Sequence, residues 1–107
     1  MQTNVNPRNE TQSFLSGLIR IHILHHACRE SIFGLGMIQE LRRHGYELSP
    51  GTLYPLLHGL EKRGYLSSRE IHSGKSRRRV YRGTASGRRA LAEASMKVKE
   101  LLRELLE

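Results

Sequence analysis

Basic side chains are concentrated in one stretch of this 107-residue sequence. Between residues 62 and 89, ten Lys and Arg residues are accompanied by one acidic residue, Glu70, whereas the rest of the chain has eight basic and nine acidic residues. Guanidinium and ammonium groups at this density can bind several phosphates, and charge that serves only solubility is spread along a chain. The stretch therefore predicts an anionic partner, nucleic acid before a membrane surface. The alternative is a solvated basic loop without a ligand.

A second group that could do chemistry is a set of histidines just before the one cysteine, Cys28. His22 and His26 are four residues apart, so on a helix they share a face and could share a metal ion. Two imidazoles make an incomplete site, and His25 and Cys28 project differently. We therefore expect no cofactor and interpret the histidines as packing or interface residues, with His22 and His26 as weak metal candidates. The sequence leaves open whether they or Cys28 respond to metal, pH or redox state.

Patterns typical of enzymes and membrane proteins are missing from the sequence. All ten acidic residues are Glu, and we find no Ser–His–acid order, phosphate-cradling Gly-rich loop or paired carboxylates. One cysteine excludes an intramolecular disulfide and a zinc ribbon. No apolar run approaches the ~18 residues of a membrane span, and the N-terminus does not resemble a signal peptide. We expect a cytoplasmic protein that is not an enzyme and does not contact a membrane.

Hydrophobic periodicity predicts two helices in the first half of the chain. The first covers residues 11–28, behind a Thr11 or Ser13 cap, with a stripe made of Phe14, Leu15, Leu18, Ile19 and His22 and with His25 as a candidate further member. The second covers residues 33–44, with Leu35, Ile38 and Leu41 on one face and Met37 beside it. Gly45 then supplies the left-handed residue that commonly ends a helix.

A third helix is expected to begin at the Ser49-Pro50 pair, a polar cap followed by proline at the first helical position. Its buried face is expected to consist of Leu53, Leu56, Leu57 and Leu60, and Gly64 ends it. Pro55 lies inside this pattern, where its ring clashes with the carbonyl four residues earlier. The first turn is therefore expected to be distorted, or the helix to begin later.

The period changes to two after Gly64, which predicts a β-hairpin. Residues 65–71 and 79–82 alternate as strands do, and residues 72–76 interrupt the alternation. The tip of this hairpin is expected to carry the cations Lys75, Arg77, Arg78 and Arg79.

A final helix over residues 85–106, capped by Thr84, carries apolar residues at heptad spacing. The predicted seam comprises Leu91, Ala94, Val98, Leu101 and Leu105, with Leu102 beside it. An isolated helix of this length is marginal in water, so the seam needs a partner. We expect a homodimer built on this helix, and the alternative is that the helix folds back on its own domain.

The second and third helices, joined by a short turn, match a helix-turn-helix, whose second helix lies in the major groove of DNA. Unpaired backbone N–H groups at the start of that helix attract phosphate, and arginines of the hairpin can grip the backbone or enter the minor groove. The predicted DNA-binding residues are Ser49, Gly51, Thr52, Tyr54, His58, Lys62, Lys75, Arg77, Arg78 and Arg79.

Two segments carry a resemblance to a known family. The run SPGTLYPLLHGLEKRGYL at residues 49–66, followed by SGKSRRRVYRGTASGRRAL at residues 73–91, resembles the PadR family of transcriptional regulators. The resemblance covers roughly Phe14 to the C-terminus and implies a dimeric winged-helix regulator, usually a repressor, of the compact branch with one C-terminal helix. Where the family often has Gly-Tyr-Glu, this chain has Gly34-Leu35-Gly36, so no tyrosine contact from that helix is carried over. It also lacks the tryptophan that stacks on effectors in some members.

The predicted fold is mainly α with a small β-hairpin: a flexible tail over residues 1–10, a winged helix-turn-helix domain over 11–83 and a C-terminal dimerisation helix over 84–107. The predicted function is a homodimeric repressor that binds a pseudo-palindromic operator. Its partners would be double-stranded DNA, a second copy and possible small-molecule effectors at the dimer interface. The alternatives are a non-specific architectural DNA binder and a protein-interaction adaptor built on the same fold.

Overall fold

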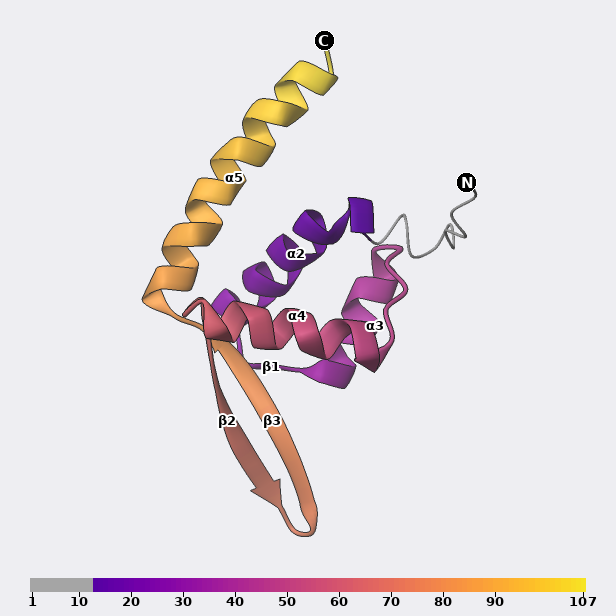
Figure 1. Cartoon of the computed structure of the whole chain (residues 1–107), viewed down its shortest axis with the longest axis vertical. Helices are drawn as coiled ribbons and strands as arrows, with labels where there is room; N and C mark the ends of the chain where they lie inside the picture. The colour runs from indigo at the N-terminus through magenta and orange to yellow at the C-terminus, as the bar shows by residue number, and fades with distance from the viewer. Residues whose placement is uncertain (1–12) are drawn as a thin grey trace, which may run out of the picture.

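Four helices and a three-stranded antiparallel sheet make up the described part of the chain, residues 13–107 of a computed structural model (Figure 1). In order they are α2 (Ser16–Arg29), β1 (Ile32–Phe33), α3 (Gly34–Arg43), α4 (Pro50–Lys62), β2 (Leu66–Ser73), β3 (Ser76–Gly83) and α5 (Ala85–Leu105). The predicted winged helix-turn-helix with a long C-terminal helix is confirmed. The predicted tail over residues 1–10 lies outside the described residues.

The core lies where α2, α3 and α4 meet the base of the sheet. Its most deeply buried large side chains are Ile19, Ile23, Leu41, Leu53, Leu57 and Tyr81. The predicted stripe on the first helix was partly wrong, because Phe14 is 86% exposed and Leu18 is 41% exposed. α2 packs on α5 and β3, and its buried side chains are Ile19, Ile23, Leu24 and Ala27, with Leu24 beside Gly87 of α5.

The inward face of α3 also differs from the prediction. Leu35 is exposed, while Met37, Ile38 and Leu41 are buried. The reason is strand β1, which the sequence analysis missed: Ile32 pairs with Tyr81 and Phe33 with Val80 of β3. Since α3 starts directly after this strand, the pairing fixes the rotation of the helix.

Helix α4 begins where predicted, with Ser49 at the N-cap position and Pro50 at the first turn. The Ser49 hydroxyl lies 3.4 Å from the Thr52 hydroxyl and does not cap a backbone N–H. The expected distortion at Pro55 was wrong, because the helix is continuous to Lys62. Pro55 and Gly51 are both exposed, so water can bond the carbonyl that the proline leaves without a donor.

The hairpin is longer and its turn tighter than predicted. Strands β2 and β3 pair from Leu66 with Gly83 out to Ser73 with Ser76, which leaves only Gly74 and Lys75 in the turn. Gly74 has φ +62°, a conformation that a two-residue turn commonly requires and that glycine adopts without strain. Residues 76–79, expected near the tip, therefore belong to β3.

Helix α5 starts at the predicted cap and projects away from the hairpin (Figure 1). The Gly87 backbone N–H donates to the Thr84 hydroxyl at 2.9 Å, and that hydroxyl donates to the Gly64 carbonyl at 2.6 Å. The first turn packs so closely on Tyr65 that a Cβ on Gly87 would overlap the Tyr65 carbonyl oxygen. The start of α5 is thus fixed to the base of the hairpin.

Replacing Gly87 with Ala should therefore destabilise the protein by about 1–3 kcal/mol, the usual cost of overpacking against a rigid neighbour. Urea denaturation at fixed protein concentration measures this loss. Gly59→Ala is the matched control, because apart from the adjacent residues and the backbone of its own helix nothing described lies within 4 Å of the added Cβ, and Ala is the better helix former by about 0.5–1 kcal/mol. Equal stability of the two variants would contradict the close packing of α5 on Tyr65.

Candidate nucleic-acid interface

Three of the predicted DNA-binding residues lie together at the start of α4. Ser49, Gly51 and Thr52 are all exposed. The Thr52 and Leu53 backbone N–H groups donate to the Ser49 carbonyl at 3.0 and 2.9 Å. This end of the helix thus offers two hydroxyls and the positive end of the helix dipole to a ligand.

Tyr54 is placed differently from its neighbours. Its side chain is half-buried, and its hydroxyl and ring lie directly against Gly34 of α3, where a Cβ would have no room. Its ring centroid lies 6.2 Å from that of His58, which is exposed on the next turn, as is Lys62 at the end of the helix. Tyr54 therefore helps to set the distance between the two helices of the helix-turn-helix.

The predicted hairpin cations are all exposed, but only Lys75 is in the turn. Arg77, Arg78 and Arg79 follow one another along β3, opposite His72, Ile71 and Glu70 of β2. Because successive residues of a strand point to opposite faces, Arg77 and Arg79 share one face of the ribbon and Arg78 has the other. The basic surface is therefore two-sided.

Two of these arginines are held by neighbouring elements. The Arg78 guanidinium lies over the Phe33 ring, 4.3 Å from its centroid. Arg79 Nη1 donates to the Ser68 hydroxyl at 3.0 Å, and Ser68 in turn donates to Glu61 of α4 at 2.6 Å. These contacts connect the basic ribbon to β1 and to the end of α4.

The supports of the two arginines were not predicted from the sequence. Phe33 lies in a two-residue strand, which is too short for an alternating pattern to reveal. Ser68 and Glu61 belong to different elements, and a link between them follows only from the packing of α4 on β2. A possible signal was the aromatic residue Phe33 placed directly before a glycine at a helix start.

The predicted dimerisation residues form a graded surface on α5. Leu91 and Ala94 are half-buried near the domain. Farther out the apolar side chains are increasingly exposed: Val98 by 38%, Leu102 by 51%, Leu101 by 54% and Leu105 by 70%. The outer half of α5 therefore presents leucines that the described chain does not cover.

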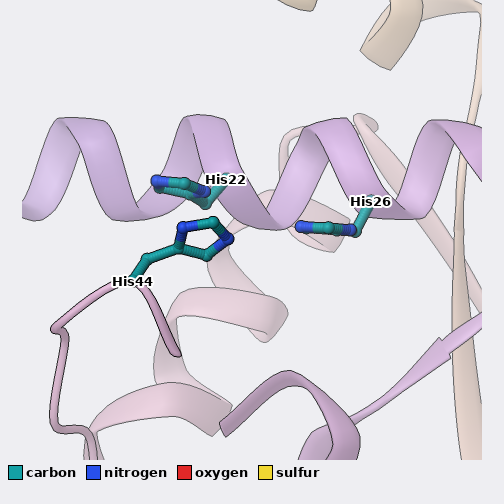
Figure 2. A group of neighbouring side chains, drawn as sticks. All are labelled: His22, His26 and His44. Atoms are coloured by element: carbon teal, nitrogen blue, oxygen red, sulfur yellow. The ribbon is translucent and has the colours of Figure 1, made fainter. Parts of the chain in front are cut away.

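The histidines of α2 gain a third member that the sequence analysis did not group with them. His22 and His26 face His44 at the end of α3 (Figure 2). The ligating nitrogens of the three side chains all lie within 4.8 Å of one another. Burial, reinforced by the neighbouring imidazoles, lowers the pKa of His22, and burial also lowers the pKa of His26 although the Glu40 carboxylate opposes it. Both shifts favour the neutral imidazole.

Residues 23–93 match the model of the "Transcriptional regulator PadR-like family". The chain belongs to this PadR-like family. The predicted resemblance is therefore confirmed, and with it a DNA-binding role in transcriptional regulation, the activity of the family.

Transcriptional regulators from several organisms resemble the chain over most of its length. It is 49% identical to "Transcriptional regulator Rv3488" of Mycobacterium tuberculosis over 96 residues, 89% of either chain. A PadR family regulator from Eggerthella lenta is 30% identical with a TM-score of 0.79, covering 92% of this chain and 90% of the other. A PadR-like regulator from Bacillus cereus is 26% identical with a TM-score of 0.75, covering 89% of this chain and 97% of the other.

Among the helices of residues 13–107, none combines the length and the apolar composition that a membrane span requires.

The contact between Tyr54 and Gly34 predicts a compensating pair of substitutions in this PadR-like protein. Gly34→Ala should lower the free energy of unfolding by about 1–3 kcal/mol, because the new Cβ overlaps the tyrosine hydroxyl. Adding Tyr54→Phe removes that oxygen and should restore part of the loss. Thermal denaturation of both single variants and the double variant gives the coupling, which is typically 0.5–3 kcal/mol for residues in contact. Strict additivity would contradict the contact.

Proposed function

We propose that this PadR-like protein is a homodimeric repressor that recognises a pseudo-palindromic operator. The observation that carries the proposal is the pairing of an exposed polar start of α4 with a basic ribbon anchored to the end of the same helix through Ser68 and Glu61. A reading element and a phosphate-binding element are thereby held in one orientation, which sequence-specific recognition needs.

Helix α4 is the proposed reading element. When the N-terminal end of α4 lies in the major groove, the hydroxyls of Ser49 and Thr52 reach base edges, and the backbone N–H of Gly51 faces a phosphate. Tyr54 contributes from its part-exposed ring while its hydroxyl end holds α4 against α3. The exposed side chains of His58 and Lys62 contact the backbone farther along.

The β2–β3 ribbon is the proposed phosphate clamp. Lys75 and Arg77 lie at its outer end, and Arg78 and Arg79 are nearer the body of the domain. Contacts of this kind position a protein on DNA and set its affinity, while base contacts set its sequence preference.

The exposed leucines of α5 support the dimer. Pairing this seam with its copy, or with the exposed Leu18 of the partner's α2 and Phe14 just before that helix, would remove apolar side chains from water. Two-fold symmetry then places two reading helices about 34 Å apart, one turn of DNA, which explains the expected pseudo-palindrome.

The salt dependence of DNA binding tests the phosphate clamp. Replacing Arg77, Arg78 and Arg79 with Ala should make the slope of log affinity against log salt concentration shallower by roughly two to three, since each phosphate contact contributes about −0.9. The control is Lys99→Ala with Arg103→Ala, which removes cations from the outer side of α5 and should leave the slope unchanged. A triple variant with the original slope would show that the ribbon does not contact phosphates.

Selection of bound duplexes from a random DNA pool at about 150 mM salt tests sequence recognition, because weak phosphate attraction is already reduced there. The expected result is an enriched palindrome with half-sites one turn apart, and lower run-off transcription from a promoter that contains it. Binding without enrichment would favour an architectural DNA binder. No duplex binding at this salt concentration would favour an adaptor that docks on an acidic protein surface.

The dimer has its own test. Leu101→Glu places a charge in the seam and should yield monomers of 12.3 kDa in sedimentation experiments at concentrations where the unaltered protein is a dimer. Operator affinity should fall at the same time, because a monomer binds only one half-site. Lys99→Glu, which adds the same side chain outside the seam, should remain dimeric. An unaltered protein that sediments as a monomer would overturn the assignment of α5.

A further inference from the structure

The histidine cluster is placed at a different point from the proposed DNA-binding surface. His22 and His26 lie on adjacent turns of α2, and His44 is the C-cap residue of α3 (Figure 2). His22 and His26 are half-buried and His44 is exposed, so the cluster lies at the boundary between the domain and solvent. The His22 and His44 rings are 4.7 Å apart between centroids, and Tyr46 packs against His22 at 5.4 Å.

A carboxylate lies beside two of the three histidines. Glu40 Oε1 lies 3.4 Å from His44 Nε2 and 3.7 Å from His26 Nε2. The other oxygen of the same carboxylate, Oε2, accepts from Arg43 Nη1 at 3.2 Å. Arg43 thus orients the carboxylate so that one oxygen faces the imidazoles, as an outer-shell partner does in protein metal sites.

We propose that His22, His26 and His44, together with Glu40, bind one Zn²⁺ ion. Three imidazole nitrogens and one carboxylate oxygen are a donor set that suits Zn²⁺ and similar transition metals, whereas Mg²⁺ and Ca²⁺ prefer all-oxygen sites. The inference goes beyond the proposed function, because it does not depend on which DNA sequence, if any, the protein recognises.

The geometry requires only small side-chain adjustments. Ligand atoms about 2.0–2.1 Å from a tetrahedral Zn²⁺ are roughly 3.3 Å from one another. The three nitrogens already lie within 4.8 Å of one another, so they need to approach by at most roughly 1.5 Å, and we expect imidazole rotations to close the site. His44 is exposed, so solvent reaches the cluster from its side, and a hollow of about 280 Å³ borders His26 and Glu40 toward β1.

The position of the site gives the ion a structural role. It would join the middle of α2 to the end of α3, just before the segment that leads into the proposed reading helix α4. A ligand that binds only the folded state raises the free energy of unfolding. The increase grows with the logarithm of the ratio of ligand concentration to Kd. Zn²⁺ at about a hundredfold excess over its Kd should therefore raise the Tm by roughly 10 °C for a domain of this size.

The test uses the full chain without an affinity tag, with Zn²⁺ as the probe. Competition with a chromophoric chelator measures stoichiometry and Kd, and the absorption of the Co²⁺-substituted protein reports a four-coordinate nitrogen and oxygen site. We expect one ion per chain. His44→Gln and His26→Gln should each weaken Zn²⁺ binding by at least tenfold, and Glu40→Gln should also weaken it.

His72→Gln is the matched control. His72 lies 3.6 Å from Glu70 on the ribbon, so it is also a histidine beside a carboxylate but outside the cluster. It should leave Zn²⁺ affinity unchanged. Circular dichroism confirms that each variant is folded, and His44→Gln, at an exposed position, is the variant least dependent on packing. Absence of stoichiometric Zn²⁺ binding, or equal losses in His44→Gln and His72→Gln, would overturn the proposal and leave the cluster as histidines paired with Glu40.

Discussion

One junction at the base of the hairpin determines how the functional parts of this protein are arranged. The Thr84 backbone N–H donates to the Tyr65 carbonyl at 3.1 Å, and its hydroxyl donates to the Gly64 carbonyl at 2.6 Å. Gly64, at φ +84°, turns the chain from α4 into β2, and Gly87 lets the first turn of α5 rest on Tyr65. The end of α4, the start of β2, the end of β3 and the start of α5 therefore meet within a few residues. The direction of the proposed dimer seam relative to the proposed reading helix is set by these contacts.

The arginines of the ribbon illustrate how packing prepares a charged surface for binding. A long flexible side chain loses rotamer freedom when it binds a phosphate, and that loss reduces affinity. The Phe33 ring beneath Arg78 and the Ser68 hydroxyl beside Arg79 restrict these side chains before any ligand arrives. The contact with Phe33 exists only because β1 pairs with β3. A strand of two residues thus contributes to the basic surface as well as to the core.

Local signals in the sequence predicted much of this architecture. The Ser49-Pro50 start of α4, the Thr84 cap and the change of period after Gly64 each reflect interactions between residues close in the chain, so they could be identified without the structure. The inward faces of α2 and α3 could not, because α5 and β1 decide them from a distance. For the same reason His22 and His26 were recognised as a pair, but His44 and Glu40 join them only when α3 packs on α2. The turn was predicted over residues 72–76 and consists only of Gly74 and Lys75, because polar residues occupy both the turn and the strand ends beside it.

The order of the sheet has a consequence for behaviour at high concentration. With β3 in the centre, β2 is an edge strand of eight residues whose outer backbone groups have no neighbouring strand in the described sheet. A long exposed edge strand invites another chain to pair with it and begin aggregation. Arg69, Glu70 and His72 place charged or polar side chains along this edge, and the arginines of β3 add repulsion between approaching copies. The same cations that suit a polyanion thus also protect the monomeric sheet from self-association.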